Sequence, residues 1–233
     1  MIQTLKEVKA LAFDADDTLW DCQSYFERVE QEYCELLADY AKPREVSASL
    51  FETETANMDE LGYGSKAFTL SLIENAVRMS GGRVSGDTVR AILELGRSLL
   101  RLPATPLEGV AETLDALRRC GNYRMAVFTK GELLDQENKL HRSGLGRYFD
   151  VVSIVSDKTP DSYRRLCREL GVEPRELCMV GNSLKSDIAP ALSVGASAVH
   201  VPFHTTWKHE EIQPFQHERM RTIERFAQLT DVV

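Results

Sequence analysis

Short apolar runs that alternate with helical spacing constrain the fold of this chain more than any other feature. Short connections join the runs to the intervening helical stretches, and the runs are as long as buried strands. The runs lie at Ala10–Phe13, Met125–Phe128, Val151–Val155, Leu177–Val180 and Ala198–Val201. Alternation of this kind is typical of an α/β fold in which helices cover both faces of a parallel sheet.

A block with helical spacing only interrupts this alternation after the first strand. Its four helical stretches lie at about 25–40, 46–61, 65–79 and 89–100. We therefore expect a helical-bundle domain at residues 20–102, inserted into a core that comprises residues 1–19 and 103–233. The flanks of the insertion are candidate hinges.

Charge and cysteine usage exclude several classes of partner. The formal net charge is −8 at pH 7 and there is no Lys/Arg block. Nucleic acids and anionic membranes are therefore not expected as partners, because both require clustered positive charge. No apolar run approaches the length of a membrane span, and no signal peptide is evident, so a cytoplasmic location is expected. The five cysteines are scattered, which favours reduced thiols over disulfides or a zinc site.

Polar residues follow four of the predicted strands. Because the carboxyl ends of parallel strands meet at one edge of a sheet, these residues are expected to converge there and to form the ligand site. In chain order they are Asp14, Asp16 and Asp17, then Thr129 and Lys130, then Asp157 and Lys158, and finally Asn182, Ser183, Ser186 and Asp187.

This set of side chains suits phosphoryl transfer. Aspartates two residues apart on an extended segment point to opposite sides, so Asp14 and Asp16 would not share one role. One carboxylate can attack phosphorus, and the other can protonate the leaving oxygen and then activate water. A magnesium ion on oxygen ligands would offset the repulsion between two anions. Thr129 and Lys158 could hold the phosphoryl oxygens.

Four segments together resemble the four motifs of the haloacid dehalogenase superfamily. The similarity covers nearly the whole chain, because the helical block resembles the cap that one subgroup inserts after the first strand. The matching segments are Phe13-Asp14-Ala15-Asp16-Asp17-Thr18-Leu19, Phe128-Thr129-Lys130-Gly131, Lys158 before Thr159-Pro160, and the segment from Val180-Gly181-Asn182 to Ser186-Asp187-Ile188.

The resemblance implies a Rossmann-like core, a mobile helical cap, Mg2+ as cofactor and hydrolysis of a small phosphate ester. Asp14 would be the nucleophile and a metal ligand. Asp16 would be the acid/base and a metal ligand through its backbone carbonyl. The second and third motifs, with Thr129, Lys130 and Lys158, would bind phosphate.

The fourth motif would complete the metal site, although it departs from the family pattern. Asn182 stands where many members have aspartate, which removes one negative charge but keeps an amide oxygen as a ligand. Asp187 is then the remaining acidic residue of this motif. It could bind the metal directly, bind it through water, or only orient Lys158 or the loop.

Three residues are candidates for the wall of the substrate pocket: Trp20, Tyr63 and Lys66. Aromatic residues at helical spacing are more often part of a core. Tyr63 and Lys66 are the better candidates because they lie in and beside a glycine-flanked loop. The segment Phe203–His209, after the last predicted strand, is a candidate for the rim of the site.

The sequence therefore favours a magnesium-dependent phosphatase that acts on a small phosphorylated metabolite or nucleotide through an aspartyl-phosphate. A 2-haloacid dehalogenase, a mutase and a phosphate-binding regulatory module without turnover are the alternatives. Asp16 argues against the dehalogenase, since a halide leaves without a proton.

Overall fold

The computed structural model describes residues 4–233 and divides into two compact units. One unit is Ser24–Pro103, and the other combines the described residues up to Gln23 with Ala104–Val233. The sequence-based prediction placed the inserted domain at residues 20–102. Trp20 and Cys22, which that prediction assigned to the insertion, belong to the larger unit.

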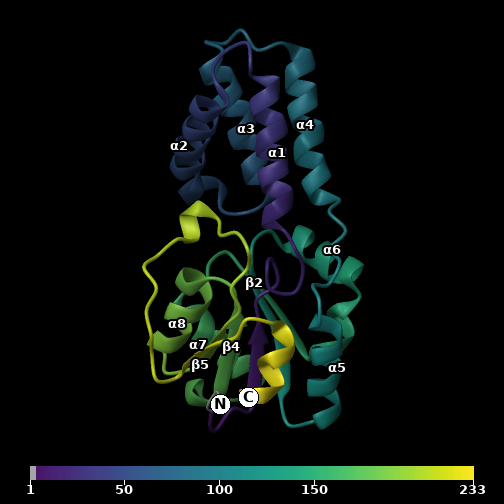
Figure 1. The fold of residues 1–233 in the computed structure, drawn as a ribbon, viewed down its shortest axis with the longest axis vertical. Helices are drawn as coiled ribbons and strands as arrows, with labels where there is room; N and C mark the ends of the chain where they lie inside the picture. Colours follow the sequence, from purple (N-terminus) through teal and green to yellow (C-terminus); the bar gives the residue numbers. More distant parts are fainter. Residues whose placement is uncertain (1–3) are drawn as a thin grey trace. The chain divides into compact units, whose positions relative to one another are not determined.

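The larger unit is built on one six-stranded sheet in which every pair of neighbours is parallel (Figure 1). The strands lie in the order β3-β2-β1-β4-β5-β6. Their bounds are Ala10–Phe13 (β1), Arg124–Lys130 (β2), Val151–Val155 (β3), Leu177–Gly181 (β4), Ser197–His200 (β5) and Met220–Thr222 (β6). The predicted α/β fold with a parallel, Rossmann-like sheet is confirmed. The short edge strand β6 was not predicted.

Helices cover both faces of this sheet. Alternate residues of a strand point to opposite faces. Ala10 and Ala12 belong to a buried cluster with residues of α7 and α8. On the other face, the ring of Phe13 packs 6.1 Å from that of Phe226, centroid to centroid. Figure 1 shows α7 and α8 on one side and α5 and α6 on the other. Their bounds are Val110–Cys120 (α5), Leu133–Ser143 (α6), Pro160–Leu170 (α7) and Ala189–Ser193 (α8).

Five short helical segments complete the larger unit. Two of them, η3 and η4, lie beside the candidate site described below. The segments are Leu145–Tyr148 (η1), Pro174–Glu176 (η2), Leu184–Ile188 (η3), Lys208–Glu210 (η4) and Phe226–Asp231 (η5).

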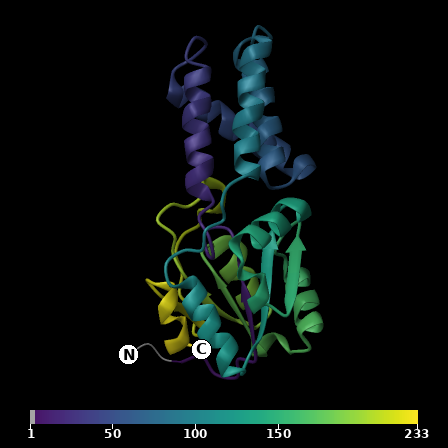
Figure 2. The ribbon, with the colours of Figure 1, turned by 90° about the vertical axis from the view of Figure 1, so that its right-hand side faces the viewer.

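The smaller unit contains four helices with a core of their own. They are α1 (Gln23–Leu36, whose first residue belongs to the larger unit), α2 (Pro43–Leu61), α3 (Ser65–Met79) and α4 (Gly86–Leu100). Helix α3 packs between α2 and α4, and Figures 1 and 2 show these helices side by side. Pro43 occupies the first turn of α2, where proline is favoured. Within residues 4–233, no helix combines the length and apolar composition needed to cross a membrane.

Candidate active site

Asp14 follows β1 directly and lies at the carboxyl edge of the sheet. Its backbone N–H donates to the carbonyl of Val180 over 2.9 Å, which continues the pairing of β1 with β4. The residue is only 7% exposed. One carboxylate oxygen accepts a hydrogen bond from Lys158, and the other accepts one from Thr18 Oγ1 at 3.2 Å. Burial raises the pKa of Asp14 to about 7; Lys158 opposes this shift and Asp187 adds to it.

Lys158 lies between two buried carboxylates. Its ammonium contacts Asp14 and lies 2.6 Å from Asp187 Oδ1. Burial alone would lower the pKa of Lys158, but the two aspartates raise it above its usual value. Lys158 is held just before α7, where Thr159 is the N-cap and accepts a hydrogen bond from the Ser162 N–H. The lysine predicted to bind phosphate is therefore charged and placed beside the predicted nucleophile.

Asp187 uses both carboxylate oxygens within the protein. Oδ1 contacts Lys158, and Oδ2 accepts from the backbone N–H of Ser183 at 2.9 Å. Tyr163 fixes the backbone of Asp187 by donating to its carbonyl at 2.7 Å. These contacts suit a residue that orients Lys158 and the loop after β4. The alternative, that Asp187 binds a metal, stays a prediction.

Gly181 is required for this arrangement because a side chain there would occupy the place of Asp187. A Cβ at position 181 would lie 2.2 Å from Asp187 Oδ2. We expect Gly181→Ala to displace the carboxylate and, with it, Lys158. The expected loss in kcat is about 10- to 100-fold, since a shift of about 1 Å in a site can cost about 100-fold.

Steady-state kinetics with a phosphate ester would measure this effect. Gly86→Ala, at a position with nothing within 4 Å of the added Cβ, is the matched control and should keep full activity. Unchanged activity of Gly181→Ala would show that the position of Asp187 does not matter.

A candidate metal site lies around the hydroxyl of Thr18. Thr18 Oγ1 is 3.2 Å from Asp14 Oδ2 and 3.1 Å from Asn182 Oδ1. The N–H of Asn182 donates back to the same hydroxyl at 3.1 Å. Within residues 4–233, no three His, Cys, Asp or Glu side chains cluster in a way that could hold a metal. A metal here would therefore rely on fewer than three carboxylates, together with amide and backbone carbonyl oxygens. These hard ligands suit Mg2+.

Asp16 contacts a different set of groups from Asp14. Its carboxylate accepts from Trp20 Nε1 at 2.7 Å, from Gln136 Nε2 at 3.1 Å and from Lys139 Nζ at 2.9 and 3.1 Å. Burial opposes ionisation of Asp16, but Lys139 and the hydrogen bonds hold its pKa below the usual value. The two aspartates thus have separate surroundings, as their spacing in the sequence predicts.

The next residue, Asp17, turns the chain away from the strand edge. Its φ is 62°, in the left-handed region that aspartate, asparagine and glycine adopt more readily than other residues. One carboxylate oxygen accepts from the N–H groups of Cys22 and Gln23, both at 2.8 Å. This geometry explains why aspartate, which tolerates a positive φ, fits at this position.

The two predicted phosphate-binding residues at the end of β2 have different environments. Thr129 is buried, and its hydroxyl accepts from Gln136 Nε2 at 2.8 Å. Lys130 donates to Ser186 Oγ at 2.9 Å and forms an ion pair with Glu210. The ammonium of Lys130 is therefore already matched by a carboxylate of the protein.

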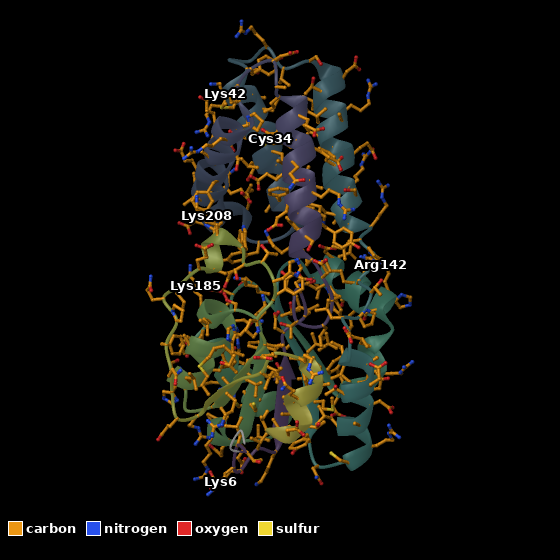
Figure 3. The ribbon with its side chains drawn as sticks, in the orientation of Figure 1. Lys6, Cys34, Lys42, Arg142, Lys185 and Lys208 are labelled. Atoms are coloured by element: carbon orange, nitrogen blue, oxygen red, sulfur yellow. The ribbon has the colours of Figure 1, made fainter. Side chains whose placement is uncertain are left out.

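The segment after β5 contacts these loops through η4. Glu210 accepts from Ser183 Oγ as well as from Lys130, and Lys185 Nζ donates to the carbonyl of His209 at 2.7 Å. Figure 3 labels Lys185 and also Lys208, the first residue of η4. Of the predicted rim segment, His209 thus contacts Lys185 in η3, and the next residue, Glu210, contacts Lys130 and Ser183.

The three candidate pocket residues lie in different surroundings. Trp20 is fully buried and its indole N–H is bound to Asp16, so it supports the aspartate from within the core. Tyr63 is half-buried and Lys66 is exposed, and both belong to the smaller unit. Their predicted contact with substrate stays a prediction.

Gln136, Lys139 and Glu210 were not predicted from the sequence. The only available signal was a pair of polar residues, Gln136 and Lys139, three apart on one helix. That pattern is more typical of a solvated face than of a site.

Comparison with known proteins identifies the family. Residues 8–195 match the haloacid dehalogenase-like hydrolases, and the chain belongs to this family. It is 27% identical to the glyceraldehyde 3-phosphate phosphatase of Methanothermobacter thermautotrophicus, over 83% of this chain and 85% of that protein. It is 26% identical to human N-acylneuraminate-9-phosphatase, over 83% and 82%.

Among solved structures, a haloacid dehalogenase-like hydrolase from Xanthomonas campestris superimposes with a TM-score of 0.84 and 29% identity. The match covers 96% of this chain and 91% of that one. The predicted membership of the haloacid dehalogenase superfamily is confirmed, and the chain is a hydrolase.

Proposed function

We propose that this protein is a magnesium-dependent phosphatase that hydrolyses a small phosphorylated metabolite or nucleotide through an aspartyl-phosphate. The observation that carries the proposal is the contact of a buried Asp14 with Lys158, next to a second, separately held aspartate, Asp16. The relatives named as phosphatases support the same reaction class.

The protein groups would divide the reaction between them. Asp14 would attack phosphorus and form the aspartyl-phosphate. Asp16, whose contacts favour the ionised form, would have to take up a proton from solvent before it could give that proton to the leaving oxygen. Asp16 would then take a proton from the water that attacks phosphorus and releases inorganic phosphate. Lys158 and Thr129 would hold the phosphoryl oxygens, on which transition-state charge collects.

The cofactor would be held by oxygen atoms of the first and fourth motifs. The candidates are the side chains of Asp14 and Asn182 and the backbone carbonyl of Asp16, with Asp187 bound directly or through water. Mg2+ bound there would supply positive charge against the anionic substrate and nucleophile.

The contacts of Asp16 favour a phosphatase over a dehalogenase. Three donors converge on this one carboxylate. A halide leaving group needs no proton, so a dehalogenase would have no use for an aspartate held in this way. An alkoxide leaving group does need one.

Hydrolysis of an aryl phosphate with Mg2+ and with excess EDTA tests the proposal. We expect EDTA to lower the rate at least about 100-fold and added Mg2+ to restore it. Activity that ignores chelation would contradict the metal dependence. Halide release from 2-chloropropionate without metal would instead support the dehalogenase, and silence in both assays would support the regulatory module. A panel of sugar phosphates, acyl-sugar phosphates and nucleotides would then identify the substrate class. Transfer of the phosphoryl group to a second hydroxyl, instead of release of inorganic phosphate, would indicate a mutase.

A further inference from the structure

A lysine other than Lys158 lies almost completely buried in the larger unit. The side chain of Lys139, on α6, is only 4% exposed. Its ammonium lies 2.9 and 3.1 Å from the two oxygens of Asp16, and 3.6 Å from Asp135 Oδ2. Burial of an ammonium is costly unless carboxylates compensate it. A lysine in this place therefore calls for an explanation that an exposed one does not.

We propose that Lys139, together with Gln136, is a positioning residue that fixes the orientation of Asp16 for proton transfer. The inference rests on the proposed function, in which Asp16 is the acid/base. It assigns a role in that reaction to α6, which carries none of the four family motifs.

The geometry around Asp16 supports this role. Lys139 contacts both carboxylate oxygens, so it opposes rotation of the carboxylate about the bond that joins it to Cβ. Gln136 and Trp20 each bind one oxygen, Gln136 at 3.1 Å and Trp20 at 2.7 Å. Three donors that together bind both oxygens restrict the carboxylate to one orientation, whereas a single hydrogen bond would leave the group free to turn.

Gln136 also connects Asp16 to the phosphate-binding end of β2. Its Nε2 donates to Thr129 Oγ1 at 2.8 Å and to the backbone carbonyl of Lys130 at 2.9 Å, besides Asp16. Gln136 and Lys139 are three residues apart and so share one face of α6. One helix face thus sets the position of the acid/base relative to the hydroxyl that would hold the phosphoryl group.

The start of α6 is shaped to allow this contact. Gly131 has a φ of 137°, and a Cβ there would lie 3.4 Å from the side chain of Gln136. Glycine at this position lets the chain turn from β2 into α6 while Gln136 folds back over the strand end.

A positioning role predicts kinetics that depend on the leaving group. Acid catalysis contributes about 100- to 10,000-fold when the acid is correctly placed, and it matters most for a strongly basic leaving oxygen. We expect Lys139→Met to lower kcat for an alkyl phosphate about 100-fold, with KM changed less than about threefold. For an aryl phosphate with an acidic phenol, the loss should be about 10-fold or less.

A double-mutant cycle with Asp16→Asn separates positioning from general damage. If Lys139 acts only through Asp16, then Lys139→Met should cost less than about twofold in the Asp16→Asn background. Inhibition by inorganic phosphate should be unchanged in Lys139→Met, because the nucleophile and Lys158 are untouched. Arg142→Met, an exposed position on the same helix that Figure 3 labels, is the control and should keep full activity.

A second pair of variants controls for misfolding caused by the replacement of Lys139. Lys139→Met leaves Asp16 and Asp135 without their shared cation, whereas Asp135→Asn combined with Lys139→Met keeps the net charge of the cluster. The double variant, compared with Asp135→Asn alone, should show the same dependence on the leaving group. Equal losses for alkyl and aryl esters, or full additivity with Asp16→Asn, would overturn the inference. Inactivity of the wild-type protein would instead contradict the proposed function.

Discussion

Replacement of Asp14 with asparagine is expected to lower kcat for phosphate-ester hydrolysis by at least about 10,000-fold. The amide keeps the size of the carboxylate but has no negatively charged oxygen to attack phosphorus. The measurement is the rate of aryl phosphate hydrolysis at saturating Mg2+. Mass spectrometry of rapidly quenched protein should show a phosphate adduct in the wild type and none in Asp14→Asn.

The fold should survive this substitution. The amide oxygen can still accept a hydrogen bond from Lys158, the amide NH2 can donate to Thr18 Oγ1, and Lys158 keeps Asp187 as its counter-ion. Asp161→Asn, at an exposed aspartate that pairs with Arg164 on the surface of α7, is the matched control and should retain activity within about twofold. If Asp14→Asn kept more than about 1% of wild-type turnover, another group would have to be the nucleophile.

The strands and the residues that follow them could be predicted from sequence because local pattern determines both. Ala10–Phe13 is fully apolar and fully buried, and it leads directly into Asp14. In a parallel sheet the chain order then brings Asp14 and Lys158 to one edge, although they are 144 residues apart. The contact between them follows from topology, without knowledge of any side-chain packing.

Other parts of the site depend on tertiary packing that leaves no recognisable pattern in the local sequence. Lys139 and Gln136 have the composition of a solvent-facing helix, yet both are buried because α6 lies over Asp16 and the end of β2. Glu210 comes from an irregular segment and meets Lys130 only through tertiary folding. The edge strand β6 has three residues with an arginine at its centre, which is too short and too polar for a strand pattern to appear.

Lys158→Met is expected to destabilise the metal-free protein by about 3–5 kcal/mol at pH 8. The substitution keeps most of the apolar volume of the lysine stem but leaves Asp14 and Asp187 buried without the cation between them. Urea unfolding in the presence of EDTA would measure the change. Lys208→Met, at an exposed lysine, should change the free energy of unfolding by less than about 0.5 kcal/mol.

The loss of stability in Lys158→Met should be smaller at low pH. The pKa of Asp14 is raised from 3.8 to about 7 in the wild-type fold, and Lys158 is the group that opposes this rise. Without Lys158 the pKa of Asp14 should be higher still, so the folded state binds a proton that the unfolded state releases above about pH 4. The free energy of unfolding of Lys158→Met must then fall as the pH increases from 5 to 8, more steeply than that of the wild type. A pH-independent difference between the two proteins would mean that Lys158 is not the charge that keeps Asp14 ionised.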